Sequence, residues 1–256
     1  MKTFILCGGF GTRLDYEGQL KAKPMVRIGS KPILMHLVES FCSQNYKEFV
    51  FCLGYKSETI IDYFLKENRK YTNVIQKKKN YIEIHFEKKN LIFRATLINT
   101  GINTGTGGRI LLAYKKMRMN NDFMMTYGDG LSNINIKKLI KFHYDNKALV
   151  TLSAVKPKQR YGVIKINKNR VNLFDNSNKK IDVHVNGGYF VISKSMIKNI
   201  KKKNIYWENE PLSYAIKKKK LFAFKHNGFW KSLDTLKDKN DFKQMIKVKE
   251  TPWKKL

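Results

Sequence analysis

Apolar residues in the first part of the chain alternate between short runs of strand length and sets at helical spacing. Residues 3–7 form a compact apolar run that ends at a glycine-rich turn, which is typical of a buried strand. Apolar positions between residues 33 and 41 then recur at helical spacing, which predicts a helix with Ser30 as its N-cap. A strand followed by a helix is therefore the first predicted unit of the fold.

The same unit recurs further along the chain. Residues 49–53 predict a second strand, followed by a helix that Ser57 can cap. Residues 123–127 predict another strand, followed by a helix with His143 on its apolar face and then by a strand over residues 148–155. Alternation of strands and helices predicts the α/β class, with a Rossmann-like, mostly parallel sheet flanked by helices.

Two regions depart from this alternation. Residues 81–86 alternate apolar and polar side chains, and residues 163–166, 171–174 and 188–192 are short apolar runs separated by turns. Such runs predict antiparallel strands added to the parallel core. The sequence has neither an internal repeat nor a Pro- or Ser-rich linker, so residues 1–256 are interpreted as one domain with a β-rich insertion and a C-terminal appendage.

Composition narrows the class of protein. The chain has 256 residues, of which 42% are hydrophobic, and no apolar run approaches the roughly 18 residues of a membrane span. Neither a transmembrane segment nor a membrane partner is predicted. Its cysteines, Cys7, Cys42 and Cys52, are odd in number and lack the spacing of zinc ligands. We interpret them as reduced thiols, which indicates a cytoplasmic protein.

The net charge of +31, from 51 Lys+Arg and 20 Asp+Glu, raises the question of nucleic-acid binding. Most of the excess is lysine, in runs at residues 77–79, 201–203 and 217–220 that lie far apart in the sequence. No RNP-type aromatic signature or zinc-finger pattern accompanies them. The pattern predicts a solvated lysine-rich surface without a specific nucleic-acid site, and attraction of small polyanionic substrates is an expected side effect.

A glycine-rich loop follows the first strand directly, with the sequence Cys7-Gly8-Gly9-Phe10-Gly11-Thr12-Arg13. Glycines keep side chains out of such a loop, so its backbone N–H groups can converge on phosphate oxygens, and Arg13 adds a charged fork. The loop has neither the Gly-Lys-Ser/Thr of a Walker motif nor the spacing of the dinucleotide fingerprint. Lys23, fixed by Pro24, can approach the same phosphate, whereas by itself it would be one more surface lysine.

Two aspartates are candidate metal ligands. Asp129, between Gly128 and Gly130, follows a central strand, where α/β sheets place ligands and a carboxylate can hold Mg²⁺ against phosphates. A simple turn is the alternative interpretation of the glycines. Asp234 lies far downstream and is either a second ligand of that metal or the N-cap of a helix that begins near Thr235.

Taken in order, these motifs resemble those of the glucose-1-phosphate cytidylyltransferase family of sugar-phosphate nucleotidyltransferases. The resemblance runs from Met1 nearly to Trp253 and rests on the glycine loop, Lys23-Pro24-Met25, Tyr127-Gly128-Asp129-Gly130, Asn186-Gly187-Gly188, Trp207-Glu208 with Pro211-Leu212, and Gly228-Phe229-Trp230 with Asp234-Thr235. It implies that CTP and α-D-glucose 1-phosphate react to give pyrophosphate and CDP-glucose, a precursor for surface polysaccharides. It also implies an NTP-binding core over residues 1–155, an acceptor-side β-rich part over 156–235 and an appendage over 236–256.

The resemblance also implies roles for individual residues. The nucleotide would be bound by Leu6, Gly8, Gly9, Gly11, Thr12, Arg13, Lys23, Thr104, Gly108, Arg109 and Asp129. Of these, Lys23, Arg13 and Asp129 would act on the reacting phosphates, and Arg109 would distinguish cytosine from uracil. Asp129 and Asp234 would hold Mg²⁺, and the acceptor would meet Tyr127, Asn186, Gly187 and Gly188. A homo-oligomer is implied as well.

One segment departs from the family pattern. After the predicted strand that ends at Phe174, the family has a Glu-Lys-Pro segment whose lysine meets the acceptor phosphate, whereas this chain has Asn176-Ser177-Asn178. Loss of such a contact would cost roughly 1.5–3 kcal/mol of acceptor binding. Either Lys179 or Lys180 takes the role, or the acceptor is a different phosphorylated or phosphonate compound. A non-catalytic nucleic-acid-binding protein is the alternative from another class, and it would release no pyrophosphate.

Overall fold

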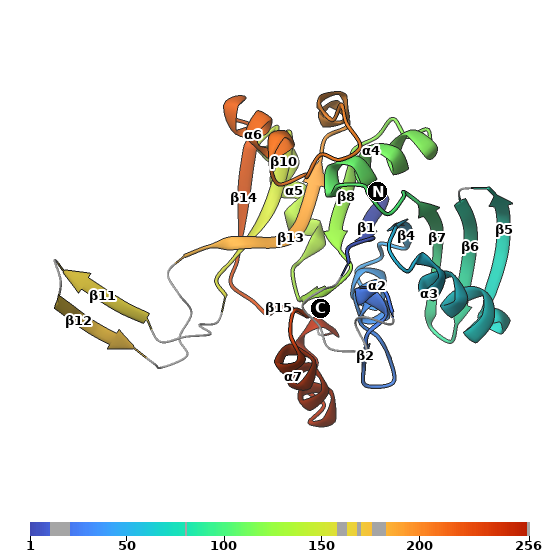
Figure 1. The fold of residues 1–256 in the computed structure, drawn as a ribbon, viewed down its shortest axis with the longest axis horizontal. Helices are drawn as coiled ribbons and strands as arrows, with labels where there is room; N and C mark the ends of the chain where they lie inside the picture. The colour runs from blue at the N-terminus through green and yellow to red at the C-terminus, as the bar shows by residue number, and fades with distance from the viewer. Residues whose placement is uncertain (11–20, 80, 158–162, 168–169, 176–182, 255–256) are drawn as a thin grey trace.

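A nine-stranded mixed sheet forms the centre of the computed structural model, which describes residues 1–10, 21–79, 81–157, 163–167, 170–175 and 183–254 (Figure 1). Its strand order is β14-β10-β13-β8-β1-β4-β7-β6-β5. The strands are β1 (Thr3–Cys7), β4 (Glu48–Leu53), β5 (Thr72–Lys78), β6 (Tyr81–Lys88), β7 (Leu91–Asn99), β8 (Phe123–Tyr127), β10 (Val150–Val155), β13 (Val185–Ile192) and β14 (Leu221–His226). The predicted α/β fold is confirmed.

The four middle strands β8, β1, β4 and β7 run parallel, as the alternation of strands and helices predicts. All five residues of β1 are buried, and they alternate between the two faces of the sheet. Ile5 and Cys7 belong to one hydrophobic cluster, whereas Phe4 and Leu6 belong to the other. Helices therefore cover both faces, which leaves the ends of the strands for a functional site.

The helices of the described chain are α2 (Ile33–Cys42), α3 (Ser57–Asp62), α4 (Thr106–Lys116), α5 (Ile136–Asp145), α6 (Glu210–Lys217) and α7 (Leu236–Lys247). Helix α2 begins after Pro32 without a side-chain cap, so the prediction that Ser30 caps it is wrong. A two-residue strand pair, β2 (Arg27–Ile28) with β3 (Lys31–Pro32), turns the chain into this helix and places Ser30 in its hairpin. Ser57 is the first helical residue of α3, because Lys56 occupies the N-cap position.

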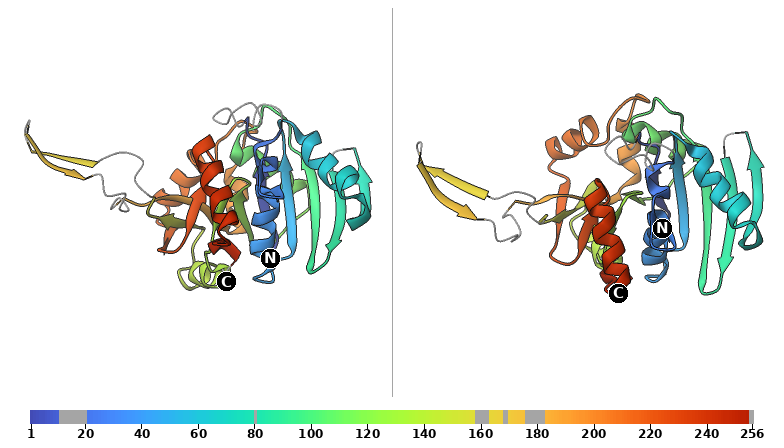
Figure 2. Two further views of the ribbon diagram at one scale, coloured as in Figure 1. Left: turned by 90° about the horizontal axis from the view of Figure 1, so that it is seen from below. Right: turned by 60° about the horizontal axis from the view of Figure 1, so that its bottom comes forward.

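Antiparallel strands extend the parallel core on both sides, as the alternating segments predict. On one side β7, β6 and β5 follow one another, and on the other β13 pairs with both β8 and β10. Strands β13 and β14, from the predicted acceptor-side part, are therefore members of the main sheet. The hairpin of β11 (Val163–Asn167) and β12 (Arg170–Asp175) instead projects far from the body of the molecule (Figure 2).

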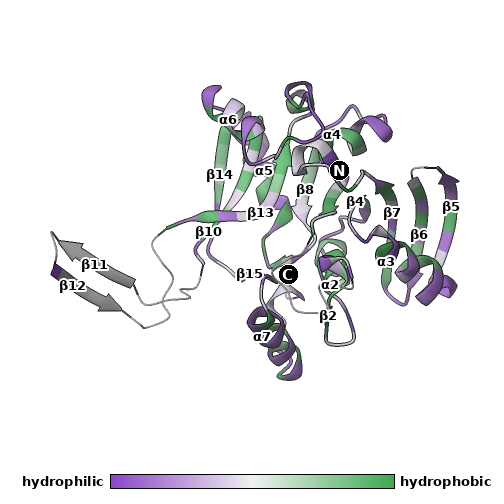
Figure 3. Cartoon of the chain, viewed as in Figure 1, coloured by the Kyte–Doolittle hydropathy of each residue, from purple (hydrophilic) through white to green (hydrophobic). Residues whose placement is uncertain are grey.

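Hydrophobic residues gather in the strands of the main sheet, whereas hydrophilic residues predominate on the outer surfaces of α6 and α7 (Figure 3). No helix among the described residues is long and apolar enough to cross a membrane. The C-terminal segment reinforces the core, because Trp253 is fully buried and packs edge-on against His36 of α2.

Burial of His36 predicts a measurable dependence of stability on pH. Burial lowers the pKa of this histidine to about 3, and the charge of Lys31 acts in the same direction. The unfolded chain takes up a proton near the ordinary pKa of about 6.5, whereas the folded chain does not, so stability is lost as the pH falls from about 6.5 towards 3. We expect His36→Gln to reduce the slope of unfolding free energy against pH by up to roughly 1.4 kcal/mol per unit in urea titrations between pH 7 and 4.5. An unchanged slope would contradict this assignment.

Candidate active site

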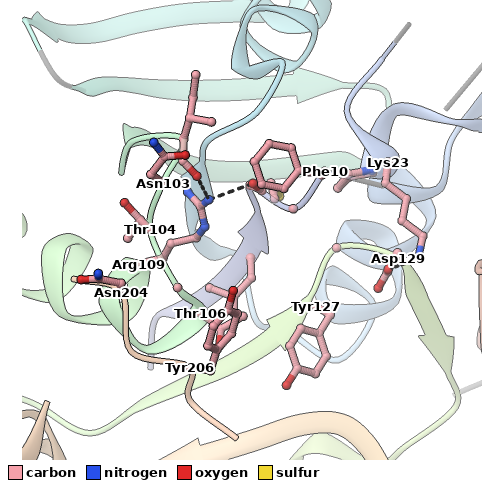
Figure 4. A pocket seen from close by; sticks show the side chains of 18 residues that line it. Phe10, Lys23, Asn103, Thr104, Thr106, Arg109, Tyr127, Asp129, Asn204 and Tyr206 are labelled. Carbon is pink, nitrogen blue, oxygen red and sulfur yellow. Dashed lines mark hydrogen bonds and ion pairs between the residues drawn. The ribbon is translucent and has the colours of Figure 1, made fainter. Parts of the chain in front are cut away.

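A pocket of about 480 Å³ opens where β1 and β8 end (Figure 4). Its wall includes most of the predicted nucleotide-binding residues that the structure describes, and several that the sequence analysis did not select. It is lined by Leu6, Cys7, Gly8, Gly9, Phe10, Lys23, Pro24, Ile102, Asn103, Thr104, Gly105, Thr106, Arg109, Tyr127, Gly128, Asp129, Asn204 and Tyr206. The volume is within the range of small-ligand sites in proteins.

Lys23 lies between the two predicted metal ligands. Its ammonium Nζ is 2.6 Å from Oδ2 of Asp129 and 2.8 Å from Oδ1 of Asp234, and the lysine side chain is 15% exposed. Burial lowers the pKa of Lys23, but the two neighbouring carboxylates more than offset it, so its pKa is raised above the ordinary value. Lys23 therefore carries its positive charge at neutral pH, and the surface-lysine alternative is wrong.

A pair of short strands brings the two aspartates together. Asp129 directly precedes β9 (Gly130–Ser132), and Asp234 follows β15 (Trp230–Ser232). Because these strands pair antiparallel, with Gly130 opposite Ser232, the start of one meets the end of the other. The N–H of Leu233 then donates to the carbonyl oxygen of Asp129 at 2.8 Å. Residues distant in sequence thus form one acidic pair around Lys23.

Helix α7 holds Asp234 in place without using it as a cap. The N-cap is Thr235, in a capping box with Asp238, so the interpretation of Asp234 as the cap is wrong. Oδ2 of Asp238 accepts from the N–H groups of Asp234 and Thr235 at 3.2 and 2.9 Å. Oδ2 of Asp234 accepts from the hydroxyl of Ser232 at 2.6 Å, while its other oxygen faces Lys23. The side chain is therefore oriented towards the pocket.

Arg109 lines the pocket, but its N–H groups donate hydrogen bonds to acceptors within the protein. Nη2 donates to the carbonyl oxygens of Gly8 and Ile102 at 2.8 and 3.1 Å. Nη1 donates to the carbonyl oxygens of Leu53 and Gly101 and to Oγ1 of Thr100. Arg109, which is 4% exposed, thus ties the glycine loop to the loop after β7 through its guanidinium. In this geometry Arg109 positions the walls of the pocket, and the predicted base contact stays a prediction.

The glycines before and within α4 serve close backbone packing. The N–H groups of Gly105 and Gly107 donate to the carbonyl oxygens of Lys203 and Ile205, both at 3.0 Å. These donors are consequently engaged and do not face a phosphate. Gly108 donates to Ile205 as well and is not among the lining residues, although the resemblance implies that it binds the nucleotide. The same contacts fix the segment that places Asn204 in the pocket wall (Figure 4).

We expect Gly108→Ala to destabilise the protein by roughly 3 kcal/mol, measured by chemical unfolding. A Cβ at this position would overlap the carbonyl oxygen of Lys203, a backbone atom that cannot move without breaking the contacts of its segment. Gly9→Ala is the matched control, since a Cβ at Gly9 meets nothing within 4 Å. Equal stabilities of the two variants would show that the packing argument is wrong.

A second cluster of hydrogen-bonded side chains lies at the pocket wall and includes Tyr127. The Tyr127 hydroxyl donates to Oε1 of Glu208, whose Oε2 accepts from Oγ1 of Thr106 at 2.8 Å. Burial raises the pKa of Tyr127, and the charge of Glu208 raises it further, so the phenol stays protonated. Behind the ring lies Gly188, where φ is +80° and a Cβ would meet Cδ2 of Tyr127 at 2.7 Å.

The structure describes only part of the predicted acceptor region. Asn186 accepts from the N–H of Gly188 at 2.8 Å, and the carbonyl oxygen of Gly187 accepts from the indole of Trp230 at 2.7 Å. These residues lie next to Tyr127, outside the pocket lining. The predicted phosphate ligands Gly11, Thr12 and Arg13, and the departing segment Asn176-Ser177-Asn178 with Lys179 and Lys180, lie outside the described residues.

Asn204 and Tyr206 are pocket residues that the sequence analysis missed. They belong to a lysine-rich segment without regular structure, and no motif or periodicity marks them. Asn204 lies with Asn103 and Thr104 on the wall opposite Lys23 and Asp129 (Figure 4). One end of the pocket thus carries the ion pair of Lys23 and Asp129, and the other carries uncharged polar side chains beside Arg109, whose donors are engaged by the protein. This arrangement suits a ligand with phosphate at one side and a ring at the other.

Comparison with known proteins agrees with this geometry. Residues 2–244 match the family model for nucleotidyl transferases. HddC of Yersinia pseudotuberculosis, solved with GMP-PN, shares the fold, with a TM-score of 0.69 at 24% identity over 96% of this chain and 99% of that chain. The fold and the matched family define the protein class as nucleotidyltransferases.

Two relatives narrow the class. The glucose-1-phosphate cytidylyltransferase of Salmonella typhimurium is 37% identical over 255 residues, which cover 99% of each chain. A probable glucose-1-phosphate cytidylyltransferase of Bacillus subtilis is 34% identical over the same share of both chains. The chain belongs to the glucose-1-phosphate cytidylyltransferase family of nucleotidyltransferases.

Proposed function

We propose that this protein joins CTP and α-D-glucose 1-phosphate to give CDP-glucose and pyrophosphate. The observation that carries the proposal is the position of Lys23 between Asp129 and Asp234 at the charged end of the pocket. Full-length similarity to two cytidylyltransferases supports the choice of CTP and of the sugar phosphate. The reaction needs no covalent enzyme intermediate, because the acceptor phosphate is already an anionic nucleophile.

The reaction is a single displacement at the α-phosphorus. An oxygen of the acceptor phosphate forms a bond to the α-phosphorus of CTP while the bond from that phosphorus to the bridging oxygen of the β-phosphate breaks. The electron pair of the broken bond leaves with pyrophosphate. No general base is needed, because the attacking phosphate oxygen is already ionised. The chain must align the two phosphates and neutralise the charge that gathers between them, which Lys23 does through its permanently protonated ammonium.

The two carboxylates fit a divalent cation such as Mg²⁺, which prefers oxygen ligands and is commonly held by one or two carboxylates together with substrate phosphates. Asp129 and Asp234 both face the ammonium of Lys23 in the structure, and the two carboxylates would hold the cation beside it. When bound, the cation would neutralise phosphate charge beside the lysine. The donor chemistry therefore agrees with the predicted magnesium site. Among the described residues, no group of three or more His, Cys, Asp and Glu side chains could hold a metal ion, and the two carboxylates would hold the cation together with substrate phosphates.

Pyrophosphate release tests the proposed function. Purified protein is incubated with Mg²⁺, glucose 1-phosphate and each of CTP, UTP, GTP and ATP in turn. We expect release with CTP to exceed release with the other three by at least about tenfold. Equal release from all four nucleotides would contradict the preference for CTP. No pyrophosphate release with any of the nucleotides would contradict the reaction with this acceptor.

A second candidate concerns the identity of the acceptor. Replacement of the Glu-Lys-Pro segment leaves a different phosphorylated or phosphonate compound as the second candidate. Turnover of CTP with another acceptor, and none with glucose 1-phosphate, would favour that candidate. The cytoplasmic location, the homo-oligomeric state and the division into core, acceptor-side part and appendage stay predictions.

A further inference from the structure

The lysine runs in the sequence differ in where the structure places them. Residues 77–79 lie at the end of β5, the outermost strand of the sheet. Residues 201–203 instead belong to the segment between the short helix Lys194–Asn199 and α6. Asn204, the next residue, lines the nucleotide pocket. One of the runs is therefore at the pocket rim.

Backbone contacts fix the run in this position. The carbonyl oxygen of Lys203 accepts from the N–H of Gly105, and that of Ile205 accepts from Gly107 and Gly108. A Cβ at Gly105 would overlap the carbonyl oxygen of Ile205. Glycine therefore allows the backbone at residue 105 to approach the backbone of Ile205 more closely than any other residue would. Since Gly105 itself lines the pocket, the run is attached to the pocket wall and does not merely lie near it in sequence.

The side chains of Lys201, Lys202 and Lys203 are exposed. Within the described part of the chain, no ion pair joins any of them to an acidic residue. The nearest acid along the segment is Glu208, whose carboxylate accepts hydrogen bonds from Tyr127 and Thr106. The positive charge of the run therefore extends into the solvent next to the segment that lines the pocket, and it acts over a Debye length of about 8 Å at physiological salt.

We propose that Lys201, Lys202 and Lys203 form a capture rim that attracts the polyphosphate of the incoming nucleoside triphosphate and accelerates its entry. The inference rests on the proposed function, since it takes the same pocket as the nucleotide site. Like charges beside a cleft raise the local concentration of an oppositely charged ligand and increase the association rate constant. They act before the ligand is seated, so the rim changes the rate of association more than the rate of dissociation.

Stopped-flow binding of a fluorescent mant-CTP tests the proposal, with the full chain and without an acceptor. The rim variant carries Lys201→Gln, Lys202→Gln and Lys203→Gln. The matched control carries Lys77→Gln, Lys78→Gln and Lys79→Gln, which remove the same net charge at the far edge of the sheet. Circular dichroism and thermal unfolding are used to check that both variants fold, as is expected for substitutions at exposed positions.

At about 20 mM salt we expect the association rate constant of the rim variant to fall roughly tenfold, and that of the control to fall less than about twofold. The difference should nearly vanish at about 0.5 M salt, because screening removes the attraction. Equal losses in the two variants, or a change confined to dissociation, would overturn the capture rim. Failure of the wild-type protein to bind mant-CTP would instead overturn the proposed function, so the two failures are distinguishable.

Discussion

Asp129→Asn is expected to lower kcat by roughly three orders of magnitude while leaving the fold intact. The substitution keeps the size of the side chain but removes one of the two negative charges around Lys23. A loss of that size corresponds to about 4 kcal/mol of transition-state stabilisation, within the range for electrostatic groups in active sites. Steady-state release of pyrophosphate from CTP and glucose 1-phosphate gives the measurement.

Asp241→Asn is the matched control for Asp129→Asn. Asp241 also forms an ion pair with a lysine, since its Oδ2 is 2.9 Å from Nζ of Lys231. It is on α7, however, and outside the pocket lining. Its substitution should change kcat less than about twofold, because this partly exposed pair lies outside the pocket lining. Near-normal turnover by Asp129→Asn, with unchanged dependence on Mg²⁺ concentration, would contradict the role of the acidic pair.

Lys23→Gln should lower kcat/KM for CTP by roughly two to three orders of magnitude. The lysine supplies a fixed positive charge at the point where the two carboxylates converge, and its raised pKa keeps that charge throughout the neutral range. Turnover of the wild-type protein should therefore show no alkaline loss from this group below its ordinary pKa of about 10.4. Initial rates at subsaturating CTP, between pH 7 and 9.5, check both expectations.

Lys31→Gln provides the comparison for Lys23→Gln. Lys31 is also partly buried and pairs with a carboxylate, that of Glu39, but it lies away from the pocket lining. We expect it to reduce thermal stability slightly and to leave kcat/KM within about twofold of the wild-type value. Similar kinetic losses in the two lysine variants would mean that Lys23 acts through stability and not through the reacting phosphates.

Periodicity alone predicts the elements that fill the core, because burial imposes a regular spacing on their apolar residues. Strands β1, β4 and β8 and helices α2 and α5 lie where the apolar pattern places them. Strand β7 was not predicted, although it lies in the parallel core: Arg94 interrupts its apolar run and its side chain is exposed. The helix α4 was also missed, since its first turn contains two glycines, which are poor helix formers.

Motif order predicts which residues the site contains, but not how their atoms are used. Asp129 and Asp234 come together beside Lys23 because two three-residue strands pair, and strands this short leave no periodic signal. The family resemblance implies that Arg109 contacts the nucleotide. In the structure its N–H groups instead donate to backbone carbonyl oxygens. Whether an arginine donates to the protein or to a ligand depends on tertiary contacts. A local sequence pattern carries no information about these contacts.

³¹P NMR of the reaction shows directly whether the pocket around Lys23 makes CDP-glucose. Wild-type protein and Asp129→Asn are incubated in parallel with CTP, glucose 1-phosphate and Mg²⁺. The account predicts that the wild-type spectrum loses the β-phosphate signal of CTP and gains the diphosphate signals of CDP-glucose with equimolar pyrophosphate, while the variant spectrum stays nearly unchanged. Pyrophosphate without CDP-glucose, or equal product from the two proteins, would contradict it.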